Sequence, residues 1–330
     1  MAADGAAPRS PNVTSQSAAA PLSRSAWSAR LPREPRVLAD QRLSDCRDPH
    51  EHAALALAVT LVVLIVVALF RINDTVSAVV LAIIGLWVAT LAYDVVEEVR
   101  FLANGAEVTP TQCSDFYPIV EELRRRWAMP RTRVLVVFRP GLGIVAFGFK
   151  EPYVIQVDSL YARALDEGEL RYALGREMAH IKLGHSRWWM LLGGSDRAVP
   201  GPLGWLAKPR NLIFAWWRRA QRTSADRAGI VAAGDVGKAI SALVKYQIGP
   251  SVAQQVTVDS LGQQAAELTH GWERWMAVLG QMLAAEPYLL YRVRLMVEWA
   301  GLPRTEPAPS AGRPPGAAPP APTNVASPRG

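Results

Sequence analysis

The sequence is poor in the residues from which cross-links and metal sites are built. Of its 330 residues only two are cysteines, Cys46 and Cys113, which are far apart and form no C-x-x-C pair. This excludes a disulfide framework and a thiolate zinc knuckle, and it is typical of a reducing compartment. Histidines are almost as few, so a histidine-built metal site must be drawn from five: His50, His52, His180, His185 and His270.

Lysine is also scarce, because 31 of the 36 basic residues are arginines, and the net charge is +7. The positive charge does not indicate nucleic-acid binding, since the sequence has no zinc finger, no aromatic RNA-binding motif and no basic helix with base-reading spacing. Arginine beside anionic lipid explains part of the charge more simply. We therefore expect no nucleic-acid partner.

Both ends of the chain lack apolar periodicity. Residues 1–52 are rich in Ala, Ser, Pro and Arg, and residues 302–330 contain nine prolines. Such compositions cannot bury enough apolar surface to offset the entropy of ordering, so we predict two disordered tails. The N-terminal tail has no early apolar region and is not expected to be a signal peptide.

The apolar residues, half of the chain, are concentrated in two segments. Residues 53–70 and 76–93 are each 18 residues long and carry no charge. As helices each would be about 27 Å long, close to the thickness of the hydrocarbon core of a bilayer. We predict a transmembrane helical hairpin over residues 53–93; a buried hairpin of a soluble protein is the alternative.

The arginines predict how this hairpin is oriented. Four arginines lie between residues 33 and 47, before the first segment, whereas the link between the segments holds only Arg71. By the positive-inside rule, both termini and everything after residue 93 would then be cytoplasmic. The expected location is the cytoplasmic membrane, as a multi-pass protein with the lipid bilayer as a partner.

Residues 94–301 alternate between helical and strand patterns. Apolar spacing predicts strands at 133–138, 143–149 and 153–157, and helices at 116–127, 211–232, 263–284 and 288–299. A long central helix is expected to begin at Asp166, with Glu169 in capping-box spacing, and to run to His185. We therefore predict an α+β domain, mostly helical, with one small sheet before its central helix.

Tryptophan is dense just after the central helix. Five tryptophans lie between residues 187 and 217: Trp188, Trp189, Trp205, Trp216 and Trp217. This density indicates a surface at the membrane interface, and ordinary core packing is the alternative.

The central helix contains the candidate chemistry. Glu177 and His180 are three residues apart, so their side chains face the same side of a helix. Apolar neighbours would partly desolvate Glu177, raise its pKa and suit it to proton transfer. In a zinc protease with H-E-x-x-H, two histidines hold the metal and the Glu activates its water, but here Arg176 occupies the first histidine position.

Several short motifs follow one another in a characteristic order. After the apolar hairpin come G-F-K-E-P-Y at 148–153, D-E-G-E-L at 166–170, E-M-A-H-I at 177–181, S-A-D-R-A-G at 224–229 and Y-R-V-R at 291–294. From about residue 105 to 300 the chain thereby resembles the membrane-anchored zinc metallopeptidases typified by the heat-shock protease HtpX and the CAAX prenyl protease. The resemblance implies a zincin-like domain in which two long helices bring the H-E-x-x-H and A-D-R-x-G turns together.

The resemblance also implies roles for individual residues. Glu177 stands at the general-base position, His180 at a retained metal-ligand position and Asp226 in the shell around the ligands. The other two ligand positions hold Arg176 and Arg222. The substrate-binding edge strand of the family falls at Gly143, Ile144 and Val145, and its late His-Pro pair is Glu286-Pro287.

We find no replacement set of zinc ligands in the sequence. A catalytic zinc needs about three protein ligands, and arginine cannot serve because it stays protonated. His185 is five residues beyond His180, roughly 140° around a helix, so we expect it to point elsewhere as a polar residue at the helix end. The expected cofactor is therefore none, with zinc only if the activity of the family persists.

The arginines could take over the charge of the metal. Loss of a divalent ion would leave Glu177 and Asp226 as uncompensated buried charges. Guanidinium groups at 176 and 222 could bind both carboxylates, and Arg222 and Asp226 are spaced i, i+4 on one helix face. We predict a metal-free salt-bridge cluster of these four side chains; the alternative is that the arginines face solvent.

These observations predict a membrane-anchored, metallopeptidase-like protein without catalytic activity that binds or regulates membrane proteins or peptides. One alternative is an active metalloendopeptidase that acts on membrane or misfolded proteins with unconventional metal ligation, or with ligands from a partner chain. The other is a non-enzymatic membrane scaffold. The sequence does not define the oligomeric state.

Overall fold

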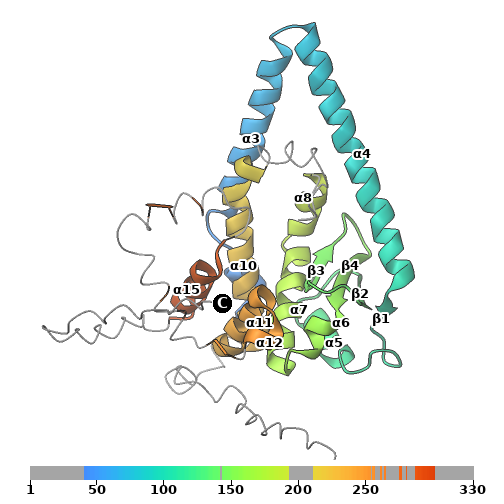
Figure 1. Ribbon diagram of the computed structural model, residues 1–330, viewed down its shortest axis with the longest axis vertical. Helices are drawn as coiled ribbons and strands as arrows, with labels where there is room; N and C mark the ends of the chain where they lie inside the picture. The colour runs from blue at the N-terminus through green and yellow to red at the C-terminus, as the bar shows by residue number, and fades with distance from the viewer. Residues whose placement is uncertain are drawn as a thin grey trace, which may run out of the picture.

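The computed structural model shows a small β-sheet packed among helices, from which two long helices project as a hairpin (Figure 1). It describes residues 41–141, 143–192, 211–253, 255–256, 261, 264, 275–276, 280 and 287–301. Residues 1–40 and 302–330, His270 and most of the helix predicted at 263–284 lie outside this part of the chain.

The sheet is mixed and has the strand order β1-β2-β4-β3. Its strands are β1 (Ala106–Glu107), β2 (Thr132–Val137), β3 (Ile144–Phe147) and β4 (Tyr153–Asp158). Strand β2 is parallel to β4, whereas β1 and β3 are antiparallel to their neighbours. The three strands predicted from apolar runs are present, with β3 shorter than expected. Strand β1 was not predicted, because two residues carry no periodicity.

Helices make up the rest of the domain and confirm the prediction of a mostly helical α+β fold. They are η1 (Leu43–Cys46), α5 (Tyr117–Arg126), α6 (Ser159–Arg163), α7 (Glu167–Lys182), α8 (His185–Leu191), α10 (Ala215–Ala233), α11 (Val236–Ile248), α12 (Pro250–Ala253) and α15 (Leu289–Trp299). Helix α11 was not predicted. Its N-cap residue is Asp235, a residue type that favours helix starts, and the Asp235 carboxylate accepts from the backbone N–H groups of Gly237 and Lys238.

Helix α7 begins where the sequence predicts and ends earlier. The Asp166 carboxylate accepts from the Glu169 N–H at 3.0 Å, and Glu169 accepts from the Asp166 N–H at 2.8 Å, which is the expected capping box. The prediction that this helix runs to His185 is wrong. It stops at Lys182, because Gly184 takes a left-handed conformation with φ of +83° and a new helix, α8, starts at His185.

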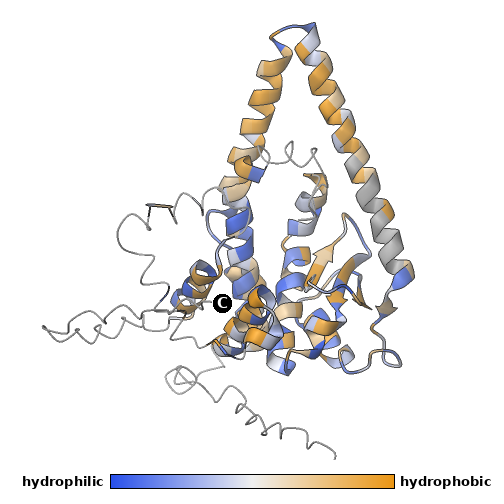
Figure 2. Cartoon of the chain, in the orientation of Figure 1, coloured by the Kyte–Doolittle hydropathy of each residue, from blue (hydrophilic) through white to orange (hydrophobic). Residues whose placement is uncertain are grey.

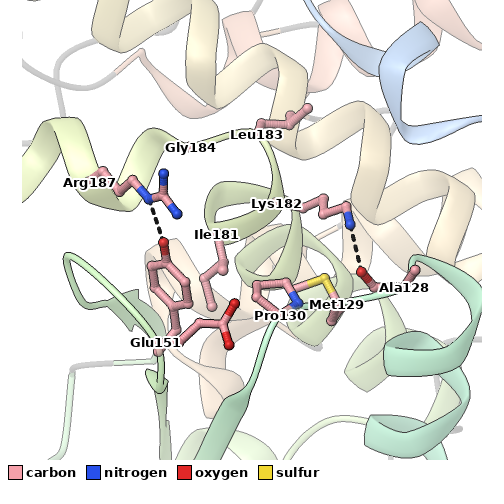
Figure 3. A pocket seen from close by; sticks show the side chains of 10 residues that line it. Ala128, Met129, Pro130, Glu151, Ile181, Lys182, Leu183, Gly184 and Arg187 are labelled. Atoms are coloured by element: carbon pink, nitrogen blue, oxygen red, sulfur yellow. Dashed lines mark hydrogen bonds between the residues drawn. The ribbon is translucent and has the colours of Figure 1, made fainter.

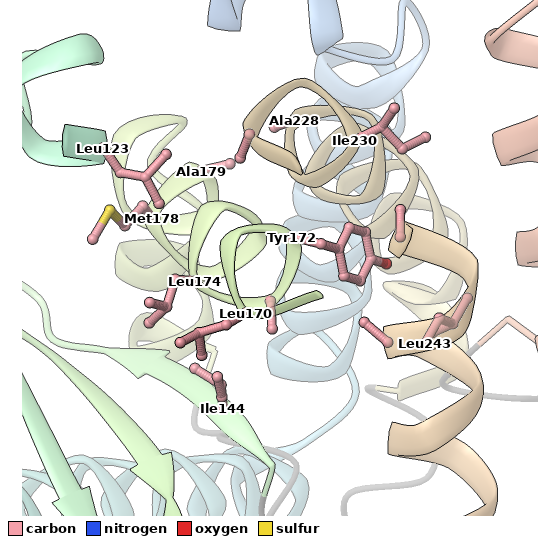
Figure 4. Close-up of a cluster of buried hydrophobic side chains, with 14 of the residues drawn as sticks. Leu123, Ile144, Leu170, Tyr172, Leu174, Met178, Ala179, Ala228, Ile230 and Leu243 are labelled. Atoms are coloured by element: carbon pink, nitrogen blue, oxygen red, sulfur yellow. The ribbon is translucent and has the colours of Figure 1, made fainter. Parts of the chain in front are cut away.

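The core lies between the sheet and helices α5, α7, α10 and α11 (Figure 4). Helices α7 and α10 cross closely because each has a glycine at the contact. A Cβ at Gly175 would lie 2.3 Å from the Cβ of Ala232, and a Cβ at Gly229 would lie 2.6 Å from the ring of Tyr172. This close crossing brings the motifs of the two helices together.

The projecting hairpin consists of α3 (Glu51–Phe70) and α4 (Asp74–Asn104), which meet at a short link. Figure 2 shows that both helices are mostly apolar near this link. Among the described helices, α3 is long and apolar enough to cross a membrane, and most of its apolar stretch is exposed. The apolar part of α4, Asp74–Ala89, is shorter. The structure therefore supports one candidate membrane-spanning helix, and the predicted pair of spans is not confirmed.

Candidate functional site

The site lies where α7 and α10 cross, and Arg176 stands at its centre. Arg176 Nη1 is 3.5 Å from Glu177 Oε1, and its Nε is 3.5 Å from Asp226 Oδ1. All three side chains are buried. The face of the Tyr246 ring covers the guanidinium, with its centroid 5.8 Å away. The guanidinium of Arg176 thus lies between two carboxylates that come from different helices.

A second arginine, from α15, completes the environment of Asp226. Arg292 Nε and Nη2 donate to the two Asp226 oxygens at 2.8 and 2.6 Å, and the Tyr172 hydroxyl donates to Oδ1 at 2.9 Å. Such bidentate pairs are the strong form of a charged hydrogen bond. Two guanidinium groups therefore neutralise two buried carboxylates. Arg292 belongs to the Y-R-V-R motif, but local spacing predicts no role for it, because its partner is 66 residues away.

The charges and the burial shift the pKa values in different directions. Burial alone would raise the pKa of Asp226, but Arg292 and Arg176 outweigh it and hold the pKa below its usual value. For Glu177 burial dominates, and Arg176 and a backbone N–H offset only part of it, so its pKa is raised. The pKa of Arg176 is raised further above its usual value because Glu177 and Asp226 outweigh its burial. The guanidinium consequently stays charged.

Glu177 also contacts the edge strand of the sheet. The N–H of Ala146, on the free edge of β3, donates to Glu177 Oε2 at 2.8 Å. Gly143, just before β3, has φ of +70°, and a Cβ there would lie 2.3 Å from the Tyr246 ring. The predicted substrate residues Gly143, Ile144 and Val145 thus lie at the start of an edge strand that Glu177 and Tyr246 cover. Glu286 lies outside the described residues.

His180 points into a chain of buried polar groups, and the prediction that His185 points elsewhere is wrong. His180 Nδ1 is 2.9 Å from His185 Nδ1, and His185 Nε2 is 2.9 Å from Glu51 Oε1 at the start of α3. Because a carboxylate only accepts, we assign the Nε2 proton to His185 and the shared Nδ1 proton to His180. Burial, followed by the positive charges nearby, lowers the pKa of His180 well below its usual value.

Glu51 has two further partners, and it is not among the site residues predicted from the sequence. Ser224 Oγ donates to Glu51 Oε2 at 2.6 Å, and Arg47 Nη1 donates to Oε1 at 2.5 Å. Its position directly before the apolar segment 53–70 is a signal in the sequence that could have identified it, because a carboxylate that is buried there needs hydrogen-bonding partners. These contacts fasten the start of α3 to α10 and to the turn after α7.

Arg222 is buried on α10, one helical turn before Asp226. Its guanidinium carbon is 5.6 Å from the centroid of the Trp189 ring, and the same ring lies 5.5 Å from that of His180. The i, i+4 spacing predicts Arg222 as the partner of Asp226. In the structure Arg292 binds the Asp226 carboxylate bidentately instead. Arg222 still contributes positive charge near Glu177.

A pocket of about 440 Å³ opens elsewhere, where α7 ends (Figure 3). On its rim Lys182 Nζ donates to the Ala128 carbonyl at 2.6 Å, and Arg187 Nε donates to the Tyr153 hydroxyl at 2.5 Å. None of the arginines and carboxylates of the α7–α10 crossing lines it. The pocket is separate from the candidate site.

The comparisons with known proteins agree with this geometry. The model of peptidase family M48 matches residues 111–300, more than half of the chain and the whole of the α7–α10 crossing. The chain belongs to peptidase family M48. Comparison with curated proteins and with solved structures gave no match.

The side chains of this M48 domain do not fit a zinc ion. Of the three ligand positions that the resemblance implies, only His180 offers a donor atom, its buried Nε2, which has no hydrogen-bond partner. The other two positions hold charged guanidinium groups, which offer no lone pair. No group of three His, Cys, Asp or Glu side chains arranged to hold a metal occurs in the part of the chain that the structure describes.

Proposed function

We propose that this M48 protein is a membrane-anchored pseudopeptidase, which binds or regulates membrane proteins or peptides and does not hydrolyse them. The observation that carries the proposal is the buried Arg176 guanidinium, which lies 3.5 Å from both Glu177 and Asp226. It supplies at this place the positive charge that the metal supplies in a zinc peptidase. Zinc is accordingly not a cofactor in this proposal.

The surroundings of Glu177 support the loss of hydrolysis. A general base has to reach the water that it activates. Here one carboxylate oxygen accepts from the Ala146 N–H and the other lies beside Arg176. Both oxygens are engaged within the protein, and the edge strand that would pair with a peptide is covered by the same carboxylate. The proposed role is therefore binding through the folded domain.

The hairpin supports anchoring in the membrane. Helix α3 is 20 residues long, and at about 1.5 Å per residue it matches a hydrocarbon core of about 30 Å. On α4 the apolar side chains Val79, Leu81 and Val88 are each more than half exposed. We propose that residues 53–70 and 76–93 both enter the bilayer, with the termini and the M48 domain on the cytoplasmic side.

The test of inactivity compares purified full-length protein with two variants. Wild type is expected to cleave casein no faster than Glu177→Gln, with or without a chelator, because neither contains a metal-activated water. Arg176→His combined with Arg222→Glu restores the three ligand types and is expected to bind zinc. Wild-type cleavage that a chelator and Glu177→Gln both abolish would establish an active metallopeptidase instead.

A further inference from the structure

Three helices share one apolar cluster beside the first turns of α3. The cluster contains Ala54, Ala58, Phe214 and Trp217, with Leu55, Val59, Val62, Trp189, Leu192 and Ile213 packed against it. The beginning of α10 therefore lies alongside α3, and the end of α8 packs against the same cluster. At about 1.5 Å per residue, Val62 lies about 17 Å along the helix from Glu51.

The three helices change from polar to apolar at about the same level. Glu51 accepts hydrogen bonds from His185 and Ser224, and only apolar and small residues follow it in α3 from Ala53 onward. Helix α8 begins with His-Ser-Arg and continues with Trp-Trp-Met-Leu. Helix α10 runs in the opposite direction: residues 212–217, which lead into it and form its first turn, are apolar, and Arg218 and Arg219 follow. Figure 2 shows the apolar end of α8 pointing toward the hairpin.

Two pairs of consecutive tryptophans, 188–189 and 216–217, each have one ring packed in the apolar cluster and one ring exposed. Trp189 and Trp217 belong to the apolar cluster, and Trp217 is almost completely buried. Trp188 and Trp216 are exposed, at 37% and 43%. Leu191, three residues after Trp188, and Leu212, four residues before Trp216, are exposed at 36% and 52%. We call these four exposed residues, Trp188, Leu191, Leu212 and Trp216, the α8/α10 face.

We propose that the α8/α10 face is embedded in the lipid bilayer beside the first turns of α3. This inference rests on the proposed anchoring by the hairpin. If α3 crosses the bilayer from Ala53, groups that pack against Ala54 and Ala58 lie at the same depth. Tryptophan is enriched at membrane–water boundaries, and leucine gains about 25 cal/mol per Å² of apolar area removed from water.

The charges next to the face agree with this position. Arg187 immediately precedes Trp188, and its Nε donates to the Tyr153 hydroxyl at 2.5 Å, so this positive charge is held beside β4, on the polar side of Trp188. His50, which lies 6.4 Å from the Trp216 ring, marks the same boundary on the α3 side. In this proposal the lipid bilayer covers the α8/α10 face, so part of the folded domain is inserted in the membrane in addition to the hairpin.

Depth measurements on the full chain test the proposal. An environment-sensitive fluorophore is attached to a single cysteine, Leu191→Cys or Leu212→Cys, in a Cys113→Ser background. Cys46 can stay, because it is fully buried and burial raises the pKa of its thiol to about 12. The protein is reconstituted into phosphatidylcholine–phosphatidylglycerol vesicles with or without brominated acyl chains, and quenching by bromine is recorded.

Two control positions make the result decisive. Leu160→Cys, in α6, has nearly the same exposure as Leu212, 51% against 52%, but α6 lies at the end of the molecule far from the link between α3 and α4 (Figure 1). Leu64→Cys lies on α3, at 60% exposure, and reports on the anchor itself. We expect strong quenching and a blue-shifted emission at 64, 191 and 212, and neither at 160.

The remaining outcomes separate the two proposals. Quenching at 64 without quenching at 191 and 212 would overturn the embedded face and leave the membrane anchor intact. Absence of quenching at 64 would overturn the anchor and, with it, the face. Quenching at 160 equal to that at 212 would show non-specific contact with lipid and would also contradict the embedded face.

Discussion

Replacing Arg292 by methionine tests whether the buried ion pairs hold the α7–α10–α15 assembly together. Arg292 Nη2 and Nε donate to Asp226 at 2.6 and 2.8 Å, and both side chains are buried. Without Arg292, Asp226 keeps the Tyr172 hydroxyl at 2.9 Å and Arg176 at 3.5 Å. Asp226 then lacks its bidentate partner, so its buried negative charge is only partly compensated.

The expected loss follows from this imbalance. Removal of one partner of a buried ion pair costs about 3–5 kcal/mol, a large part of a typical unfolding free energy of about 5–15 kcal/mol. For a domain of this size each kcal/mol corresponds to about 2–4 °C in Tm, so Arg292→Met should lower Tm by about 6–20 °C. Thermal unfolding of purified protein in detergent, followed by circular dichroism, measures the shift.

The same helix offers a matched control. Arg294 is two residues away, and its Nε donates to Glu298 at 2.8 Å, but its side chain is 55% exposed. Because exposed pairs contribute about 0–1 kcal/mol, Arg294→Met should change Tm little. Adding Asp226→Asn to Arg292→Met restores the charge balance and should recover part of the loss. Equal effects of Arg292→Met and Arg294→Met would refute the reasoning.

Three further predictions concern the same crossing. Gly175→Ala should destabilise the fold by about 1–3 kcal/mol in a denaturant titration, because its methyl group would overlap Ala232; an unchanged midpoint would contradict the close crossing. At neutral pH Asp226→Asn should destabilise more than Glu177→Gln, since the pKa of Asp226 is lowered and that of Glu177 is raised; the reverse order would contradict the charge assignment. The pKa of His180 is lowered, chiefly by burial, so below about pH 6.5 the unfolded chain takes up a proton that the folded chain refuses. Stability should therefore fall as the pH drops from about 7.5 to 5.5, by up to about 1.4 kcal/mol per pH unit, and His180→Gln should flatten this slope; an unchanged slope would assign it to other groups.

The sequence predicts those features that depend on local interactions. The capping box at Asp166, the strands and the placement of Glu177 near Asp226 follow from short-range spacing or from ordered motifs. The end of α7 could not be predicted from periodicity, because Gly184 adopts a left-handed conformation and turns His185 back toward His180. A helical pattern of apolar residues predicts that the helix continues, and the pattern alone does not show where a glycine ends it.

Contacts between residues far apart in the sequence could not be predicted either, and these contacts determine how the site is built. Helix spacing makes Arg222 the natural partner of Asp226, whereas the structure gives that place to Arg292 from a helix 66 residues further on. Glu51 binds His185 from a distance of 134 residues along the chain. Such pairs depend on how helices cross, and a single sequence does not specify that crossing.

The most direct test of the central claim, that arginine replaces the metal of an M48 site, is the zinc content of the purified full-length protein. It should be measured by elemental analysis after dialysis, beside the Arg176→His/Arg222→Glu variant. We expect little zinc in wild type and about one zinc per chain in the variant, which regains three ligand types. Near-stoichiometric, tightly held zinc in wild type would contradict this claim.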